Sequence, residues 1–160
     1  MLVNSDYLIV TLMAGFEWFD ESLQNSLREA GWPQLTRPES MVFMHVQMNI
    51  VRPADIARSL RLTRQAVHST IQTLVKRGIF EMADDPVDGR IKIVQLSKMG
   101  LAMRADGRRI TDRLTEELSE KIGADAVIAM RNALKGGWGD PVLVKLGEPG
   151  QSAKNYLENQ

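Results

Sequence analysis

Two short helical segments separated by a tight connection, in the middle of the chain, most constrain its fold. Pro53 suits the first turn of a helix over residues 53–60, because that turn needs no backbone N–H from it. Thr63 is a good N-cap for a second helix over residues 64–77, and Gly78 is typical of the residue that ends a helix. Two helices joined by so few residues predict a helix-turn-helix unit.

The second of these helices has two distinct faces. Val67, Ile71, Leu74 and Val75 recur at helical spacing and form one apolar stripe, which we expect to face the core. The polar residues on the other side and at the helix start are Thr63, Arg64, Gln65, His68, Ser69, Gln72, Thr73 and Lys76. Such side chains can hydrogen-bond to base edges in the major groove of DNA or to phosphates. Taken alone, the helix pair fits an ordinary amphipathic pair with a solvated face equally well.

A β-hairpin after the helix pair shifts the balance towards DNA binding. Two short strands are predicted over residues 79–83 and 91–96, joined by a loop of turn residues. Arg90 lies where such a wing could insert into a narrow minor groove, whose potential is strongly negative. Asp88 could hold the Arg90 guanidinium in a fork geometry. The alternative is a surface ion pair of little value, and the acidic loop residues would repel phosphate unless they fold back.

Four further helices flank this unit. Apolar periodicity predicts a long helix over residues 5–30 and a second over residues 36–48, which opens with a capping box. After the hairpin, a long helix is expected over residues 97–123 and a last one over residues 124–135. The predicted fold class is therefore mainly α with a small β-hairpin wing (α+β).

The net charge of the chain is zero, but its distribution is uneven. Residues 50–113 carry thirteen basic and seven acidic side chains. Residues 1–49 carry two basic and six acidic side chains, and residues 114–160 carry five and seven. DNA binding depends on the local field at the phosphates, so a basic middle segment is compatible with it. A solvated basic face without a partner fits the charges about as well.

Composition excludes several other classes of function. The chain has no cysteine, so thiolate metal sites and disulfides are excluded. Its two histidines, His45 and His68, are too far apart in sequence to imply a metal site, and no phosphate-binding loop or nucleophile motif occurs. We expect no enzyme activity, no cofactor and no metal. No run of eighteen apolar residues and no secretion signal occurs at the start, so we expect a cytoplasmic protein without a membrane partner.

Two runs of sequence resemble a known family. Residues 62–79 are similar to the recognition-helix segment of the MarR (multiple antibiotic resistance regulator) family, and residues 85–100 resemble its wing and the start of the next helix. With the flanking helices, the resemblance covers roughly residues 5–135. It implies a homodimer that binds a pseudo-palindromic operator in double-stranded DNA, usually as a repressor released by a small ligand. By the same resemblance, Gln65 and Ser69 would read the major groove and Arg90 the minor groove.

The resemblance also predicts the organisation of the chain. We expect one winged helix-turn-helix regulator domain over residues 1–135, with a DNA-binding lobe at about 36–97. The helices at about 5–30 and 98–135 would form the dimer interface. Residues 136–160 extend past the usual end of the family and contain an apolar cluster. This extension is either a disordered tail or an arm that packs on the partner subunit.

An effector pocket would lie between the two parts of the domain. The candidate residues are on the first two helices: Phe16, Trp18, Phe19, Met41, Met44 and His45. Methionine lines adaptable pockets well, but aromatic and methionine side chains at helical spacing also fit a simple core. His45 could bond an acidic ligand or be a satisfied interior histidine.

A rival hypothesis is a winged-helix module that binds proteins and not DNA. A protein-binding face should expose aromatic or aliphatic side chains, whereas this one carries arginine, glutamine, histidine, serine and lysine. The sequence therefore favours a DNA-binding transcriptional regulator.

Overall fold

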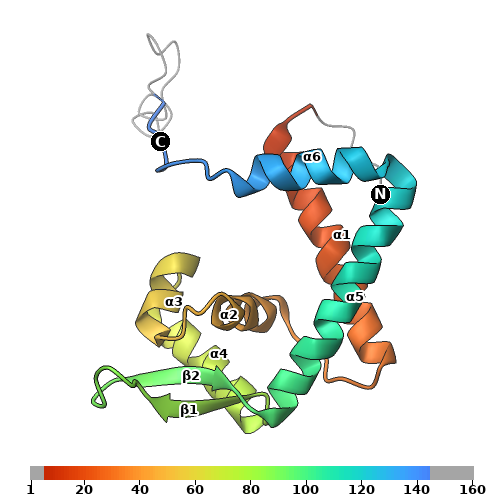
Figure 1. Cartoon of the computed structure of the whole chain (residues 1–160). Coiled ribbons are helices and arrows are strands. Elements are labelled where there is room, and N and C mark those ends of the chain that lie inside the picture. The colour runs from red at the N-terminus through yellow and green to blue at the C-terminus, as the bar shows by residue number, and fades with distance from the viewer. Residues whose placement is uncertain (1–5, 145–160) are drawn as a thin grey trace, which may run out of the picture.

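The computed structural model describes residues 6–144 and contains six helices and one hairpin in that range (Figure 1). In chain order the elements are α1 (Leu8–Glu29), α2 (Arg37–Gln47), α3 (Pro53–Leu60), α4 (Arg64–Lys76), β1 (Phe80–Asp84), β2 (Lys92–Leu96), α5 (Lys98–Ile122) and α6 (Ala124–Lys135). The predicted fold class, mainly helical with a two-stranded wing, is confirmed.

The elements form two groups that α5 connects. In one group α2, α3 and α4 pack together, and the β1–β2 hairpin lies against α2 and α4. In the other group α5 packs along α1 and continues into α6 (Figure 1). The first group contains the predicted helix-turn-helix and wing, so α5 is the main connection between that unit and the rest of the chain.

The core is centred on the inner face of α4. Val67, Ile71 and Leu74 are fully buried there, as the apolar stripe predicts. The rings of Phe43 on α2 and Phe80 on β1 stack against each other with 5.8 Å between their centroids. Burial of each such aliphatic side chain contributes about 1.5–3 kcal/mol, so the core fixes the orientation of α4.

The hairpin is held at its base as well as within itself. Its strands are antiparallel, with Phe80 opposite Leu96 and Asp84 opposite Lys92. The backbone N–H of Val94 on β2 also donates to the carbonyl of Val51, at 2.9 Å. The segment before α3 therefore runs beside β2 and ties the hairpin to the helix-turn-helix.

Local capping explains why most helix boundaries agree with the prediction to within a residue. The hydroxyl of Thr63 accepts from the N–H of Ala66 (3.1 Å) at the start of α4, and the hydroxyl of Ser97 accepts from the N–H of Gly100 (3.0 Å) at the start of α5. Gly78 has a φ of 73°, a conformation that ends α4 without strain.

The first helix is the exception, because α1 begins at Leu8 and not at Ser5. Residues 1–5 lie outside the described part of the chain. Tyr7 precedes the helix in an extended conformation and provides no side-chain cap, so no local signal marked this boundary.

Candidate DNA-binding surface

The outer face of α4 is a continuous polar surface. Arg64, Gln65, His68, Ser69, Thr73 and Lys76 are exposed, and Gln72 is half-buried. No ion pair within residues 6–144 involves Arg64 or Lys76, so both cations face solvent. The structure thus brings these predicted residues together on one face of a well-packed helix.

Two hydroxyls of this surface, those of Thr63 and Thr73, make hydrogen bonds to the backbone of the chain itself. The Thr63 side chain caps the helix, and the Thr73 hydroxyl donates to the carbonyl of Ser69 at 3.1 Å. The Thr70 hydroxyl donates in the same way to the carbonyl of Ala66. The side chains of Gln65, His68 and Ser69 make no hydrogen bond within the described residues, which leaves them available to contact a ligand.

An ion pair anchors the end of α4 to the start of α2. Arg77 donates from Nη1 to Glu39 Oε1 (2.8 Å) and from Nη2 to the carbonyl of Gln34 (2.6 Å). Glu39 is buried, and its carboxylate also accepts from the N–H of Thr36 (2.7 Å). Burial alone would raise the pKa of Glu39, but the hydrogen bonds from Thr36 and Arg77 outweigh it and lower that pKa. Glu39 is therefore a buried, charged anchor for the helix.

The wing presents an exposed arginine at the end of a hydrogen-bonded loop. Arg90 is exposed, and within residues 6–144 its guanidinium makes no ion pair. Asp88 does not hold that guanidinium in a fork, contrary to the sequence-based expectation. Its Oδ1 accepts from the backbone N–H of Arg90 at 3.1 Å, because a two-residue spacing favours this local turn.

One acidic residue of the wing folds back, as a DNA-binding role would require. Asp85 is buried, and its Oδ1 accepts from the backbone N–H groups of Val87 (2.8 Å) and Asp88 (3.3 Å). Its Oδ2 accepts from Arg52. The hydrogen bond from Val87 and then that from Arg52 lower the pKa of Asp85. Sequence reasoning missed this pair, since the two residues are thirty-three positions apart.

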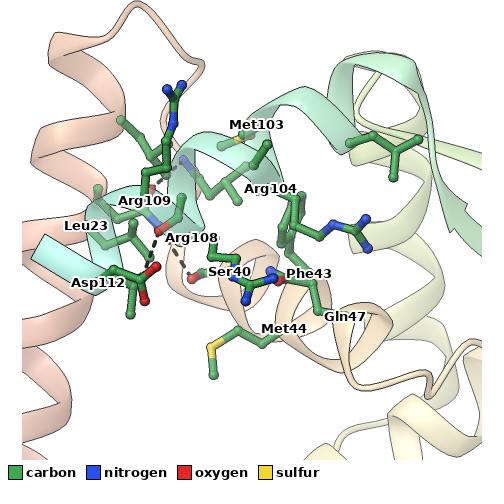
Figure 2. Close-up of a pocket in the computed structure, with 17 residues that line it drawn as sticks. Leu23, Ser40, Phe43, Met44, Gln47, Met103, Arg104, Arg108, Arg109 and Asp112 are labelled. Carbon is green, nitrogen blue, oxygen red and sulfur yellow. Dashed lines mark hydrogen bonds between the residues drawn. The ribbon is translucent and has the colours of Figure 1, made fainter. Parts of the chain in front are cut away.

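A cavity of about 820 Å³ lies between α1, α2 and α5, where the two groups of elements meet (Figure 2). Its apolar lining includes Leu23, Phe43, Met44 and Met103. Its charged lining comes from α5: Arg104, Arg108, Arg109 and Asp112. Sequence reasoning missed all of these except Met44, because it placed the cavity on the first two helices alone.

The predicted effector residues are not gathered around this cavity. Of the six, only Met44 lines it, and Phe19 lines a smaller hollow between α1, α5 and α6. Trp18 packs edge-on against Phe19 and beneath Lys121, and Arg37 lies over the ring of Phe16.

His45 is buried, and its ring nitrogens contact the backbone of Met41 and the side chain of Ser59. Its Nδ1 donates to the carbonyl of Met41 (2.8 Å), and its Nε2 lies 2.9 Å from the hydroxyl of Ser59. Both ring nitrogens of this buried histidine therefore have partners, and the contact with Ser59 joins α2 to α3. This is the satisfied interior histidine, one of the two alternatives that the sequence left open.

The described residues contain neither a candidate metal site nor a membrane-spanning helix. Residues 6–144 contain no group of three His, Asp or Glu side chains that could hold a metal ion. None of the helices in that range is long and apolar enough to cross a membrane.

The geometry of α3, α4 and the hairpin defines the class: the chain is a winged helix-turn-helix protein. Residues 34–91 match the profile of the MarR family, and these residues contain α2, α3, α4, β1 and the wing loop. No curated protein matches the sequence.

Several solved structures share the fold over most of the chain. Apo MarR from E. coli matches with a TM-score of 0.63 at 21% identity, covering 82% of this chain and 97% of its own. CouR from Rhodococcus jostii RHA1, bound to p-coumaroyl-CoA, matches with a TM-score of 0.63 at 20% identity over 88% and 96% of the two chains. A MepR variant from S. aureus bound to an oligodeoxyribonucleotide matches with a TM-score of 0.53 at 17% identity over 82% and 95%. The chain therefore shares its winged-helix fold with these proteins, and its residues 34–91 match the MarR family.

Proposed function

We propose that this protein is a transcriptional regulator that binds double-stranded DNA as a homodimer and represses its target genes. The observation that carries the proposal is the exposed polar face of α4, held by a buried apolar face and by the Arg77–Glu39 ion pair. A rigid helix with glutamine and serine on its outer face can hydrogen-bond to base edges in the major groove. MepR, which shares the fold, has been solved with an oligodeoxyribonucleotide.

The residues we assign to DNA binding divide by chemistry. Gln65, His68, Ser69, Gln72 and Thr73 would face base edges, and Arg64 and Lys76 would contact phosphates. Arg90 would enter the minor groove, since its guanidinium lies on a projecting wing, makes no ion pair within residues 6–144 and suits the negative potential of that groove. Thr63 would act mainly through the helix cap, and Asp88 through the turn that positions the Arg90 backbone.

The alternative is a winged-helix module that binds another protein without binding DNA. Such a surface should be aromatic or aliphatic at its centre. On α4 the apolar side chains of Val67, Ile71 and Leu74 are buried and that of Val75 is half-buried, whereas the large exposed side chains are polar. We therefore favour DNA as the partner of this face.

A gel-shift titration over a range of salt concentrations tests the proposal. Duplex sites would first be selected from a random pool, so that no operator sequence need be known. Phosphate contacts predict that log affinity falls linearly with log salt, by about 0.9 for each phosphate neutralised. Failure to retain any duplex in dilute buffer would exclude DNA binding and leave the protein-binding alternative.

Homodimer formation is proposed from the apolar residues that the single chain leaves exposed. Some of the exposed apolar residues are scattered over other elements, but one group lies at the start of α1, on α6 and after it: Leu8, Ile9, Met13, Ile128, Met130, Leu134, Trp138, Val142, Leu143 and Val144. Figure 1 shows the start of α1 beside α6, away from α4. Two-fold pairing through these helices would place two copies of α4 about one turn of DNA apart, roughly 34 Å.

The extension after α6 would contribute to the same interface. Residues 142–144 are between 74% and 85% exposed in the single chain, so an arm that packs on the partner subunit would remove them from water. Leu146 and the rest of the extension lie outside the described residues.

We further propose that the cavity between α1, α2 and α5 binds a small effector that releases the repressor from DNA. Its volume of about 820 Å³ suits a drug-sized ligand, and it touches both groups of elements. Arg104 and Arg108 make no ion pair within residues 6–144, so the cavity would favour an anion with an apolar body. CouR, of the same fold, has been solved with a large anionic ligand, p-coumaroyl-CoA.

Fluorescent probes test this effector site. Anilinonaphthalene sulfonate, an apolar anion, should bind more tightly than N-phenyl-1-naphthylamine, its uncharged analogue. Arg104→Gln and Arg108→Gln should each remove that preference. Arg113→Gln is the matched control, because Arg113 lies on the same helix outside the cavity. Equal binding of both probes would argue against an anionic effector.

A protein that regulates transcription acts where the DNA is, so we place it in the cytoplasm. Residues 34–91 match a family of regulators, so we propose no catalytic activity, cofactor or metal for the protein.

A further inference from the structure

The wing loop is fastened to the helix-turn-helix by a single buried carboxylate. Asp85 stands at the end of β1, where the loop begins, and only 6% of its surface is exposed. Its Oδ2 accepts a hydrogen bond from Nε of Arg52 at 2.7 Å and lies 2.6 Å from Nη2 of the same guanidinium. Its Oδ1 accepts from two loop N–H groups, so four donors converge on one carboxylate.

Arg52 belongs to a different element from the loop it holds. It is the N-cap residue of α3, the first helix of the helix-turn-helix, but its side chain makes no cap hydrogen bond. The guanidinium reaches the wing instead. Because its neighbour Val51 is also bonded to Val94 on β2, this short segment contacts the wing at two points.

The ion pair between Lys92 and Asp84, also on the hairpin, does not connect the hairpin to another element. Lys92 and Asp84 lie on paired strands, and both side chains are 63% exposed. Their contact stays within the hairpin, so it does not restrain the hairpin relative to α4. An exposed pair of this kind contributes little in water. The Arg52–Asp85 pair is the one that crosses between elements.

We propose that the Arg52–Asp85 ion pair is a strut that positions the wing loop, and with it Arg90, relative to the recognition helix α4. The inference rests on the proposed DNA binding and assigns these residues to positioning rather than to direct contact. A loop held in one place before binding loses less conformational freedom when it meets DNA. The pair also neutralises a carboxylate that would otherwise repel phosphates close to Arg90.

Arg52 could instead contribute to DNA binding by contacting a phosphate directly. The Asp85→Asn variant distinguishes this role from the positioning role of the ion pair. If Arg52 binds phosphate, this change frees the guanidinium and removes a negative charge, so affinity for DNA should hold or rise. If the pair is a strut, affinity should fall by about tenfold, a typical effect within one ion-pair network. The asparagine oxygen can still accept from Val87 and Asp88, which spares the local turn.

Asp84→Asn is the matched control. It removes one negative charge from the same hairpin and breaks only the exposed pair. The strut predicts unchanged or slightly tighter binding for this variant, against the loss for Asp85→Asn. Arg52→Gln should weaken binding like Asp85→Asn, and the double variant should be no worse than either single one, because each change breaks the same contact.

Hydrogen exchange on the free protein tests the strut without DNA. In Arg52→Gln and Asp85→Asn, exchange of the backbone amides in residues 87–90 should accelerate, while that of the α4 amides should stay as in the wild type. Wing exchange identical to the wild type, or equal DNA affinity of the Asp84→Asn and Asp85→Asn variants, would overturn the strut. A wild-type protein that binds no duplex would overturn the proposed function and not the strut.

Discussion

Gln65 and Ser69 are the residues through which we expect base sequence to be read. Both are exposed on α4, and neither supports the core, so alanine at either position should leave folding intact. Loss of a bidentate base contact costs about 1–3 kcal/mol at the base pair concerned. We therefore expect Gln65→Ala and Ser69→Ala to change the sites selected from a random duplex pool. Lys76→Ala, a phosphate contact, should weaken all sites alike, and the same uniform loss for Gln65→Ala would contradict base reading.

Arg90 is the residue on which the role of the wing depends. Its side chain is exposed and unpaired in the described part of the chain, so removing it should not disturb the hairpin. We predict that Arg90→Ala weakens binding to a selected site by about 1–3 kcal/mol, as for other groove-inserted arginines. Fluorescence anisotropy with a labelled duplex measures this. Wild-type affinity at moderate salt would show that the wing does not reach the DNA.

The contribution of Glu39 to the stability of the fold depends on pH. Its pKa is lowered from 4.5 in the folded protein, so its contribution to stability is complete above that value and is lost as the pH falls through the folded pKa. We predict that Glu39→Gln lowers the free energy of unfolding by about 1–2 kcal/mol at neutral pH, because a charge-assisted bond to Arg77 is lost. The difference from the wild type should shrink in acid. Urea unfolding at several pH values checks this, with the exposed Glu21→Gln as the control.

At the residue scale, the sequence predicted which side chains of a single helix are buried or exposed, but it missed contacts between residues on different elements. The buried and exposed faces of α4 follow from helical periodicity, so Val67 and Gln65 lie where expected. The Arg52–Asp85 pair joins residues far apart in the chain, and no spacing rule predicts such a partner. The nearer pairing of Asp88 with the Arg90 guanidinium failed because a local backbone N–H competes for the carboxylate.

At the scale of elements, the close approach of α5 to Ile79, the residue before β1, depends on a glycine. A Cβ atom at Gly100 would lie 2.2 Å from the carbonyl oxygen of Ile79, a backbone atom that cannot move aside. We predict that Gly100→Ala destabilises the fold by about 1–3 kcal/mol or more. Gly107→Ala, on the same helix, would meet only Leu23 at 3.9 Å and should stabilise by about 0.5–1 kcal/mol. Urea denaturation distinguishes the two, and similar values for both would refute the close approach.

Helix and strand boundaries were predictable because their signals are local. The Thr36–Glu39 capping box, the Thr63 and Ser97 caps and Gly78 all act within four residues of the boundary that they set. The strands β1 and β2 begin one residue later than predicted, since pairing between strands decides their ends. The start of α1 lacks a side-chain cap and was predicted three residues too early.

At the scale of the whole molecule, the cavity shows where sequence reasoning ends. Its charged wall is part of α5, whose arginines look like an ordinary solvated helix face in the sequence. They become part of a cavity only because α5 packs along α1 and passes α2. The packing of helices distant in sequence is set by many weak contacts together, so the sequence does not show which helices enclose a cavity. For this reason the six effector residues predicted from the first two helices missed the wall formed by α5.

The last prediction concerns the oligomeric state. Ile128 on α6 is 52% exposed in the single chain, and isoleucine in that position is explained if a second copy covers it. We expect the wild type to sediment as a dimer of two 18.0 kDa chains. Ile128→Glu would bury an unpaired carboxylate in an apolar interface, at a cost of several kcal/mol, and should shift the protein towards monomer. It should also weaken DNA binding, since one copy of α4 cannot span two half-sites. Val87→Glu is the control for sedimentation only, because Val87 is 88% exposed at the far end of the wing and far from α6. Sedimentation of the wild type as a monomer at all concentrations would contradict the dimer. An Ile128→Glu variant that is as dimeric as Val87→Glu would show that the dimer interface does not include Ile128.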